Sequence, residues 1–590
     1  MPSYLTELCR FHERMLRDPD SDMPREGLSS ELISFALVLD DAGNLVAVDD
    51  LRNSKGRPAR MSVPAAVVRS SNKTPNYLWD NSGYILGVDN KKPASDNRLK
   101  HERFTSFHEK MLSGVDDREA VALLAFLSRW TPNQIESPKF ADFKEDIQTG
   151  NIVFRLEGSD TYFHQSPVLM DIWMRPFTAG SDEIFGDAHP KIKGVTGAQP
   201  TGASLISFNI PSFRSYGKED NASSPLTKAQ AKAYTTALNY LLQYDHGQVM
   251  RVGDTSMVFW AEKAHPLEKE MNRLFDIPLP ADKEESPQDG DRVALLRDVL
   301  TAIRNGEPVS NYTEEGTRFF VLGLAPNVAR ISVRYWLDST LKELLRHAAR
   351  WYDDLSMERS SEKLPEYPSL RWLLVNSVAQ GGKSENIPPE LAGQLAKCAL
   401  FGSRFPENVY IAILQRIRAD KQVNYCRAAL IKAFFCRNRN MKEDGMRSLD
   451  KEETNIGYRL GRAFALLEKA QKDANGGGQK SKGKNAPDTG SIASRYLGAA
   501  STTPGAVFPT LLRLSKHHVT KLVSSGRTGY ETWYNCQMED ILAGMTAFPA
   551  VLSLDDQGRF FLGYYNQQRD FYRKKDDGAE VPAEITEETE

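Results

Sequence analysis

The hydrophobic pattern changes its period near residue 265, and this change restricts the chain to a fold with two kinds of structure. Before that position, apolar residues occur in short runs around turn residues, as in residues 33–52 and 249–263, which predicts β-hairpins. After it, apolar residues recur every three to four positions, as in residues 388–437, which predicts amphipathic helices. We therefore expect an α+β protein with an N-terminal mixed α/β domain, a helical middle region and a C-terminal all-helical bundle.

The length of the chain requires several domains, because 590 residues exceed what one hydrophobic core organises. We predict an α/β domain over residues 1–265, a mainly helical domain over residues 266–445 and a helical bundle over residues 446–590. Residues 576–590 contain seven acids and no Lys or Arg, which is typical of a disordered tail.

Composition argues against several classes of protein. No run of about 18 apolar residues occurs, and the N-terminus lacks the apolar core of a signal peptide, so we expect a cytoplasmic protein without a membrane partner. The five cysteines are scattered without a CxxC pair, which predicts free thiols rather than a zinc site. GGKS at residues 381–384 lacks the first glycine of a P-loop, so we expect no cofactor.

Two basic stretches stand out, since the net charge of the whole chain is only −3. Residues 52–110 contain twelve Lys and Arg against five acids, and residues 411–442 contain eight against one, so each stretch carries +7. The first interleaves cations with Tyr77 and Trp79, which indicates either a nucleic-acid contact or a solvated loop with two core aromatics. Most charge runs are solvated faces, but two separate runs in a near-neutral chain favour a path for a polyanion.

Residues 194–242 contain three glycines within nine positions, then a short apolar run, a polar loop and a helix start at Thr227. A glycine-rich loop before a helix N-terminus suits a phosphate backbone, although a plain structural turn has the same composition. Residues 319–336 predict a strand, a turn and a helix. On that helix Arg330 and Arg334 would share one face, either as a solvated face or as phosphate contacts.

Catalytic motifs are weak. Asp142 and Lys144 form the D-x-K ending of a metal-nuclease motif, and Asp116 and Asp117 could supply further carboxylates, but such triplets are common by chance. No HExxH, GxSxG or His-Asp motif occurs. His517 and His518 are adjacent, so their side chains diverge on a helix and do not favour joint metal ligation.

Four stretches of the chain resemble the large subunit of type I-C CRISPR surveillance complexes (Cascade). They are TPNYLWDNSGYILG at residues 74–87, the glycine-rich stretch at 194–242, FFVLGLAPNVARISVRYW at 319–336 and YRLGRAFALLEKAQ at 458–471. The resemblance implies a non-catalytic subunit of a crRNA-guided antiviral complex. Such a subunit recognises the motif that flanks a DNA target (the PAM), promotes R-loop formation and holds the displaced strand.

The resemblance also implies the partners. They are double-stranded target DNA, the displaced single strand, the crRNA-bound backbone subunits, a helicase-nuclease and a small subunit made from the same reading frame. For that small subunit, Met446 is the candidate internal start, with Met441 nearly as good.

On this basis residue type and position predict two sets of DNA contacts. The PAM-proximal set lies in the first polar loop and the glycine-rich stretch: Arg69, Asn72, Lys73, Asn76, Gly197, Gln199, Thr201, Asn209 and Lys218. The displaced-strand set consists of cations expected on helices: Arg330, Arg334, Arg416, Arg418, Arg427, Lys432, Arg513 and Lys516. Two alternatives stay open, a metal-dependent nuclease and a scaffold that binds only crRNA and partner proteins.

Overall fold

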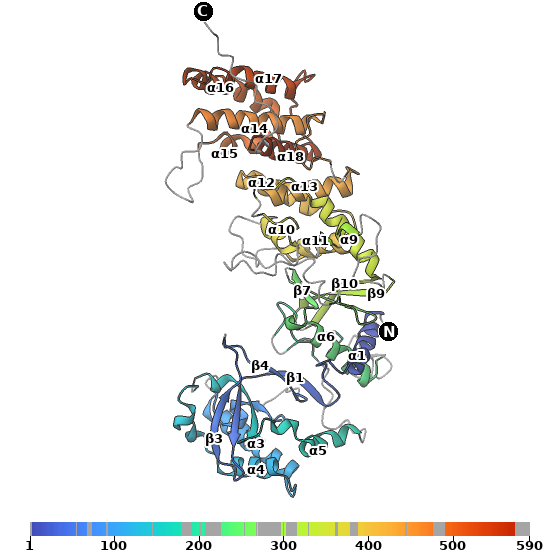
Figure 1. The fold of residues 1–590 in the computed structure, drawn as a ribbon, viewed down its shortest axis with the longest axis vertical. Coiled ribbons are helices and arrows are strands. Elements are labelled where there is room, and N and C mark those ends of the chain that lie inside the picture. The colour runs from blue at the N-terminus through green and yellow to red at the C-terminus, as the bar shows by residue number, and fades with distance from the viewer. Residues whose placement is uncertain are drawn as a thin grey trace, which may run out of the picture. The chain divides into compact units, whose positions relative to one another are not determined.

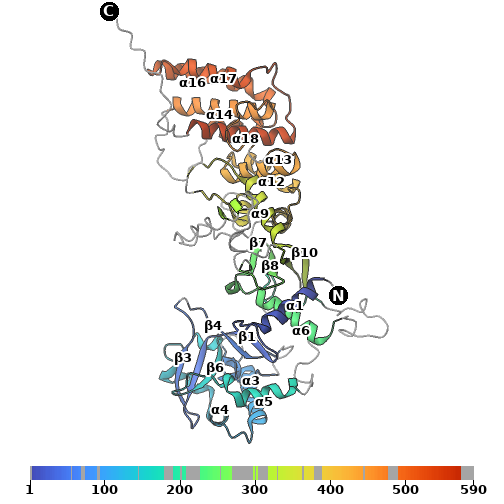
Figure 2. The same ribbon diagram turned by 45° about the vertical axis from the view of Figure 1, so that its right-hand side comes forward.

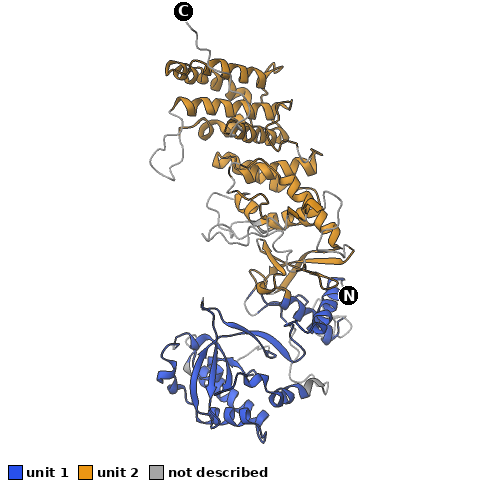
Figure 3. Ribbon diagram, in the orientation of Figure 1, with its two compact units in different colours: residues 1–194, 199–240 blue, residues 195–198, 241–590 orange. Residues whose placement is uncertain are grey.

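A computed structural model divides the chain into two compact units (Figure 3). Unit 1 comprises residues 1–194 and 199–240, and unit 2 comprises residues 195–198 and 241–590. The structure describes residues 3–54, 56–67, 74–89, 93–143, 145–178, 191–199, 202–206, 226–252, 254–266, 268, 297–298, 300–302, 316–328, 330–359, 361, 364–377, 388–442, 445–475 and 490–572.

Unit 1 is built on a mixed four-stranded sheet in the order β3-β2-β6-β5. Its strands are β2 (Phe35–Leu39), β3 (Leu45–Asp50), β5 (Asp80–Asn81) and β6 (Asn151–Leu156). β2 pairs antiparallel with β3, as the sequence pattern of residues 33–52 predicted, and parallel with β6. A separate antiparallel pair joins β1 (Leu28–Ile33) to β4 (Ala59–Pro64).

Alternation along β2 assigns the two faces of this sheet. Phe35, Leu37 and Leu39 point into the main core, which the helices cover, whereas Ala36 packs in a smaller cluster with Val63 of β4. The helices of unit 1 are α1 (Ser3–Arg17), α2 (Ser82–Ile85), α3 (Ala94–Leu112), α4 (Arg118–Arg129), α5 (Pro167–Thr178) and α6 (Lys228–Leu241). The apolar spacing of the sequence predicts helices around residues 3–17, 104–112 and 118–127, and α1, α3 and α4 confirm them.

Unit 2 begins with an antiparallel sheet in the order β10-β9-β8-β7 (Figure 1). The strands are β7 (Val249–Val252), β8 (Thr255–Ala261), β9 (Arg318–Asn327) and β10 (Arg330–Thr340). The predicted hairpin at residues 249–263 is confirmed, and β8 also pairs with β9. The sheet therefore continues across residue 265, where the change of sequence pattern predicted a domain boundary.

The predicted helix that carries Arg330 and Arg334 is wrong, because these residues lie on strand β10. The segment contains Ile, Val, Tyr, Trp and Thr, which favour strands, and β10 pairs with β9 on both sides of a register shift at Arg334. Residues 323–327, expected to form a turn, are instead part of β9, and the chain reverses between Asn327 and Arg330.

Helices make up the rest of the described part of unit 2. A first group follows β10: α9 (Leu341–Leu355), α10 (Leu370–Ser377), α11 (Pro389–Phe401), α12 (Glu407–Asp420) and α13 (Tyr425–Asn438). A second group is a bundle: α14 (Ile456–Ala474), α15 (Ile492–Ala500), α16 (Pro504–Ser524), α17 (Tyr530–Leu542) and α18 (Leu554–Phe571). The α+β class is confirmed, and none of the helices in the described ranges has the length and apolar character of a membrane span.

Glycines allow α14 and α18 to pack closely, and both ribbon views draw the two helices side by side (Figures 1 and 2). A Cβ added to Gly461 of α14 would lie 2.0 Å from the carbonyl oxygen of Phe560, and one on Gly563 of α18 would lie 2.1 Å from that of Tyr458. These backbones touch where no other residue fits, so the glycines set the spacing between the two helices.

We predict that Gly461→Ala destabilises unit 2 by about 1–3 kcal/mol, because the added methyl group forces the two helices apart. The urea midpoint of the unit 2 transition measures this effect. The matched control is Gly393→Ala on α11, where an added Cβ meets nothing within 4 Å. That control should leave the midpoint unchanged or raise it, since alanine favours a helix. Equal midpoints for the two variants would contradict the packing role.

Candidate nucleic-acid interface

The aromatic residues of the first basic stretch lie in the core of unit 1. Tyr77 stacks between His108 and Trp173, with ring centroids 5.7 and 5.2 Å away. Trp79 donates its indole N–H to the carbonyl oxygen of Pro64 at 2.8 Å. The two aromatic residues are therefore core residues, and neither ring can stack on a base in this structure.

Asn76 is also buried, with 5% of its surface exposed, so its side chain is not available to a DNA base. Its side-chain oxygen accepts a hydrogen bond from the backbone N–H of Val67 at 2.9 Å, and its own N–H donates to Asp80 at 2.8 Å. Asn76 thus joins the two ends of the segment between residues 67 and 76. The other predicted contacts in that segment, Arg69, Asn72 and Lys73, lie outside the described residues.

The glycine-rich stretch has the backbone geometry that its composition predicted. Gly194, Gly197 and Gly202 have φ angles of 86°, 76° and 84°, in the left-handed region that favours glycine. Gly197 and Gln199 are exposed, and the carbonyl oxygen of Gln199 accepts the N–H of Gly202 at 2.8 Å. The remaining predicted residues, Thr201, Asn209 and Lys218, lie outside the described residues.

The β9–β10 hairpin presents Arg330 and Arg334 at the surface. Arg334 is about half exposed and forms an ion pair with Asp254 at 3.3 Å. Val328, in the turn, is 91% exposed and has a φ of 56°, which is a rare conformation for a β-branched residue. The hairpin therefore carries partly neutralised cations next to a strained turn.

Two cations predicted to contact the displaced strand are interior residues. Arg427 is 2% exposed and Lys432 is fully buried, both on α13. Arg427 donates to the carbonyl oxygen of Asn376 at 3.0 Å and forms an ion pair with Asp420. Their prediction as surface contacts is therefore wrong for this structure, because their charges are used inside unit 2.

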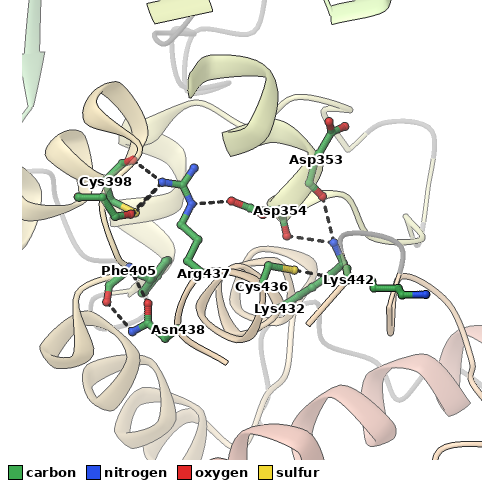
Figure 4. Close-up of polar contacts among 10 residues, drawn as sticks. Asp353, Asp354, Cys398, Phe405, Lys432, Cys436, Arg437, Asn438 and Lys442 are labelled. Atoms are coloured by element: carbon green, nitrogen blue, oxygen red, sulfur yellow. Dashed lines mark hydrogen bonds and ion pairs between the residues drawn. The ribbon is translucent and has the colours of Figure 1, made fainter. Parts of the chain in front are cut away.

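Lys432 and Arg437 hold the ends of neighbouring helices (Figure 4). The ammonium group of Lys432 donates to the carbonyl oxygens of Asp353 and Asp354, at the C-terminal end of α9, at 3.0 and 3.1 Å. Arg437 forms a buried ion pair with Asp354 at 2.5 Å and donates to the carbonyl oxygen of Cys398, in the last turn of α11. Burial lowers the pKa of Lys432, and raises that of Asp354 although Arg437 opposes this shift.

Two further predicted cations, on α12, are half-buried and already engaged. Arg416 forms an ion pair with Asp420. Arg418 donates from its Nε to the carbonyl oxygen of Leu414 at 3.2 Å. Most cations of the basic stretch at residues 411–442 thus already have partners within unit 2.

Helix α16 carries the clearest exposed basic face in the described part of unit 2. Arg513 and Lys516 are both exposed, as predicted, and no salt bridge joins either to a described residue. His517 and Lys521 are exposed on the same face, and we did not predict them. A spacing of four residues links Arg513 to His517 and His517 to Lys521, and this was a usable signal. We call Arg513, Lys516, His517 and Lys521 the α16 basic face.

The candidate nuclease residues do not form a metal site in the described part of the chain. Asp117 is the N-cap of α4, where its side chain accepts the N–H of Ala120 at 3.1 Å. Asp142 is exposed, and Lys144 lies outside the described residues. No group of three His, Cys, Asp or Glu residues with metal-binding geometry occurs among the residues that the structure describes.

Met446, the candidate internal start, is buried, with 5% of its surface exposed. Its carbonyl oxygen accepts a hydrogen bond from the side chain of Asn566 on α18 at 2.9 Å. The bundle helices α14 to α18 all follow this residue in the chain.

The exposed cations on α16 and on the β9–β10 hairpin have the chemistry of a protein that contacts a polyanion. Comparison with known families identifies the family to which the chain belongs. The profile of the CRISPR-associated protein (Cas_Csd1) family matches residues 8–572, and the chain belongs to this family. Membership ties the protein to CRISPR defence. No curated protein matches the sequence.

We predict that the stability of unit 1 falls as the pH decreases from about 6.5 to about 4. Burial lowers the pKa of His108 from 6.5 to about 4, and its Nε2 accepts the N–H of Leu78 at 2.9 Å. Between these two pH values His108 is protonated in the unfolded chain but not in the folded chain. The free energy of unfolding of unit 1 therefore falls by about 3 kcal/mol by pH 4. Burial also lowers the pKa of His164 to about 4, which adds in the same direction.

Hydrogen exchange of unit 1 peptides at pH 4.5, 5.5 and 7 measures this dependence. The control is His108→Gln, which removes the titrating group, so its pH dependence should be smaller than that of the wild type. An unchanged dependence would contradict the assignment.

We predict that Lys432→Met and Lys516→Met differ in stability although both remove one charge. Lys432→Met leaves two buried carbonyl oxygens of α9 without a donor and should cost about 1–3 kcal/mol. Lys516→Met removes an exposed charge and should change stability by less than about 0.5 kcal/mol. Urea midpoints of the unit 2 transition test the pair, and similar midpoints would show that Lys432 has no structural role.

Proposed function

We propose that this chain is the non-catalytic large subunit of a type I-C crRNA-guided surveillance complex. In this role it recognises the PAM in double-stranded DNA, promotes R-loop formation and binds the displaced strand. The observation that carries the proposal is the family match over residues 8–572, together with the resemblance of the four sequence stretches to that subunit. The exposed α16 basic face supplies a surface of suitable charge.

The proposed PAM reader is the polar segment that contains Arg69, Asn72 and Lys73. Short amide side chains can read base edges in a groove, while the two cations can neutralise phosphates. Buried Asn76 has a different part, because it ties the two ends of this segment to the core of unit 1. The second proposed reader is the loop around Gly197 and Gln199, where glycine permits close approach of a backbone.

The proposed path for the displaced strand runs along α16. Cations three or four residues apart on a helix lie about 5–6 Å from one another, so they can contact successive phosphates. Arg330 and Arg334 on the β9–β10 hairpin are additional candidates at the surface. Arg427 and Lys432 are left out of this path, since both are buried.

The proposed partners follow from the same role. They are the crRNA-bound backbone subunits, a helicase-nuclease that destroys the target, and a small subunit from the same reading frame. A product that starts at Met446 would contain α14 to α18, including the whole α16 basic face. Such a product could therefore extend the path for the displaced strand.

We predict that the assembled complex discriminates among duplexes with different flanking trinucleotides, and that Asn72→Ala with Lys73→Ala abolishes the discrimination. Electrophoretic mobility shifts on a full set of flanks measure it. Gln199→Ala, measured alongside, tests the second proposed loop. If the double variant discriminates like the wild type, the reader lies elsewhere; if the wild type does not discriminate, the scaffold alternative is favoured.

We predict that replacing Arg513, Lys516 and Lys521 with Gln weakens single-stranded DNA binding and lowers the slope of log K against log salt by about 2. Fluorescence anisotropy with a labelled oligo-dT at several salt concentrations measures the slope. The control replaces three exposed cations on other parts of unit 2, Lys397, Arg404 and Lys451, with Gln. Equal slopes for both triple variants would contradict a path along α16.

A further inference from the structure

The α16 basic face is exposed and lacks described acidic partners. Arg513, Lys516 and Lys521 have no salt bridge to any residue that the structure describes, and Arg527 follows in the exposed turn after the helix. The pKa of the neighbouring His518 is consistent with this positive charge. Burial lowers that pKa, and the charges of Lys521 and His517 lower it further. An exposed row of cations of one sign attracts a polyanion.

The last described helix brings the chain next to this face. α18 ends at Phe571, whose ring packs against that of Trp533 on α17 with centroids 6.1 Å apart. Trp533 lies in the first turn of α17, and α17 begins six residues after Ser524, the last residue of α16. The last described residues of the chain therefore lie near the C-terminal end of α16.

The segment that follows has the complementary charge. Residues 573–575 are basic, and residues 576–590 then contain seven Asp and Glu with no Lys or Arg. The 18 residues from 573 to 590 can span up to about 60 Å. The α16 basic face extends only about 12 Å from Arg513 to Lys521, so the segment is long enough to reach all of it.

We propose that residues 576–590 bind the α16 basic face of their own chain and compete there with nucleic acid. The acidic segment takes the place of the phosphates, and a DNA strand must displace it in order to bind. This competition weakens the binding of unrelated nucleic acid. A strand that other contacts already hold nearby displaces the segment more readily. The inference rests on the proposed function of α16 as a path for a nucleic-acid strand.

Zero-length carbodiimide cross-linking of the full chain tests the contact. Lys516 and Lys521 should cross-link to acids of residues 576–590, whereas the exposed Lys397 and Lys451 of the same unit should not. An excess of oligo-dT should reduce the yield. Cross-links to the control lysines at equal yield would overturn the proposal. In a mixture of isotopically labelled and unlabelled protein, cross-links that form only between different chains would also overturn it.

Binding of labelled oligo-dT tests the competition. Replacing the seven acids of residues 576–590 with Asn and Gln should tighten binding about tenfold at low salt, if the segment occupies the face about nine-tenths of the time. The same change in a chain with Arg513, Lys516 and Lys521 replaced by Gln should have no effect, because the shared surface is gone. A shuffled segment that keeps its acids should behave like the wild type.

The outcomes separate the two proposals. If the α16 substitutions weaken DNA binding but neutralising the acidic segment changes nothing, the competition is wrong and the function of α16 stands. If the α16 substitutions do not affect DNA binding while the cross-links form, the face binds only the acidic segment. The competition and the proposed strand path would then both be wrong.

Discussion

The middle of unit 2 depends on three buried cations on α13 that hold the ends of other helices. Arg427, Lys432 and Arg437 follow one another at intervals of five residues and donate to carbonyl oxygens near the C-terminal ends of α10, α9 and α11. The last carbonyl groups of a helix lack intrahelical donors and carry partial negative charge, so a cation satisfies both needs. Removing one of these cations would leave buried acceptors without donors.

Within unit 2, the buried cations of α13 have a structural role, whereas the exposed cations of α16 have the proposed functional role. The cations of α13 are buried and held by internal partners such as Asp354 and Asp420. On α16, by contrast, the buried side is apolar, with Phe508 and Leu511 in the core, and the basic residues face outward. Only the second arrangement leaves cations available to a phosphate backbone, so the proposed strand path belongs to α16.

The local sequence pattern was sufficient to predict several helices and hairpins, but it was not sufficient to predict the pairing of β9 with β8. The helices of residues 388–437, which are α11 to α13, and the hairpins β2–β3 and β7–β8 were predicted. The helix expected at residues 330–336 is strand β10, because two arginines four residues apart share a face on either kind of element. What decides the matter is the pairing of β10 with β9 and of β9 with β8. The β8–β9 pairing joins residues more than fifty positions apart, and a local window cannot detect it.

The sequence by itself determined the α+β class, the family resemblance, the two basic stretches and the three glycines with positive φ. These follow from residue type and spacing, which act locally. Only the tertiary structure decided which cations are exposed. Arg427 and Arg513 both lie on helices with several basic residues, yet Arg427 is buried, as is nearly all of α13, whereas Arg513 is exposed. Whether a cation is buried or exposed depends on which helices pack against its own helix, and this packing is a property of the tertiary structure.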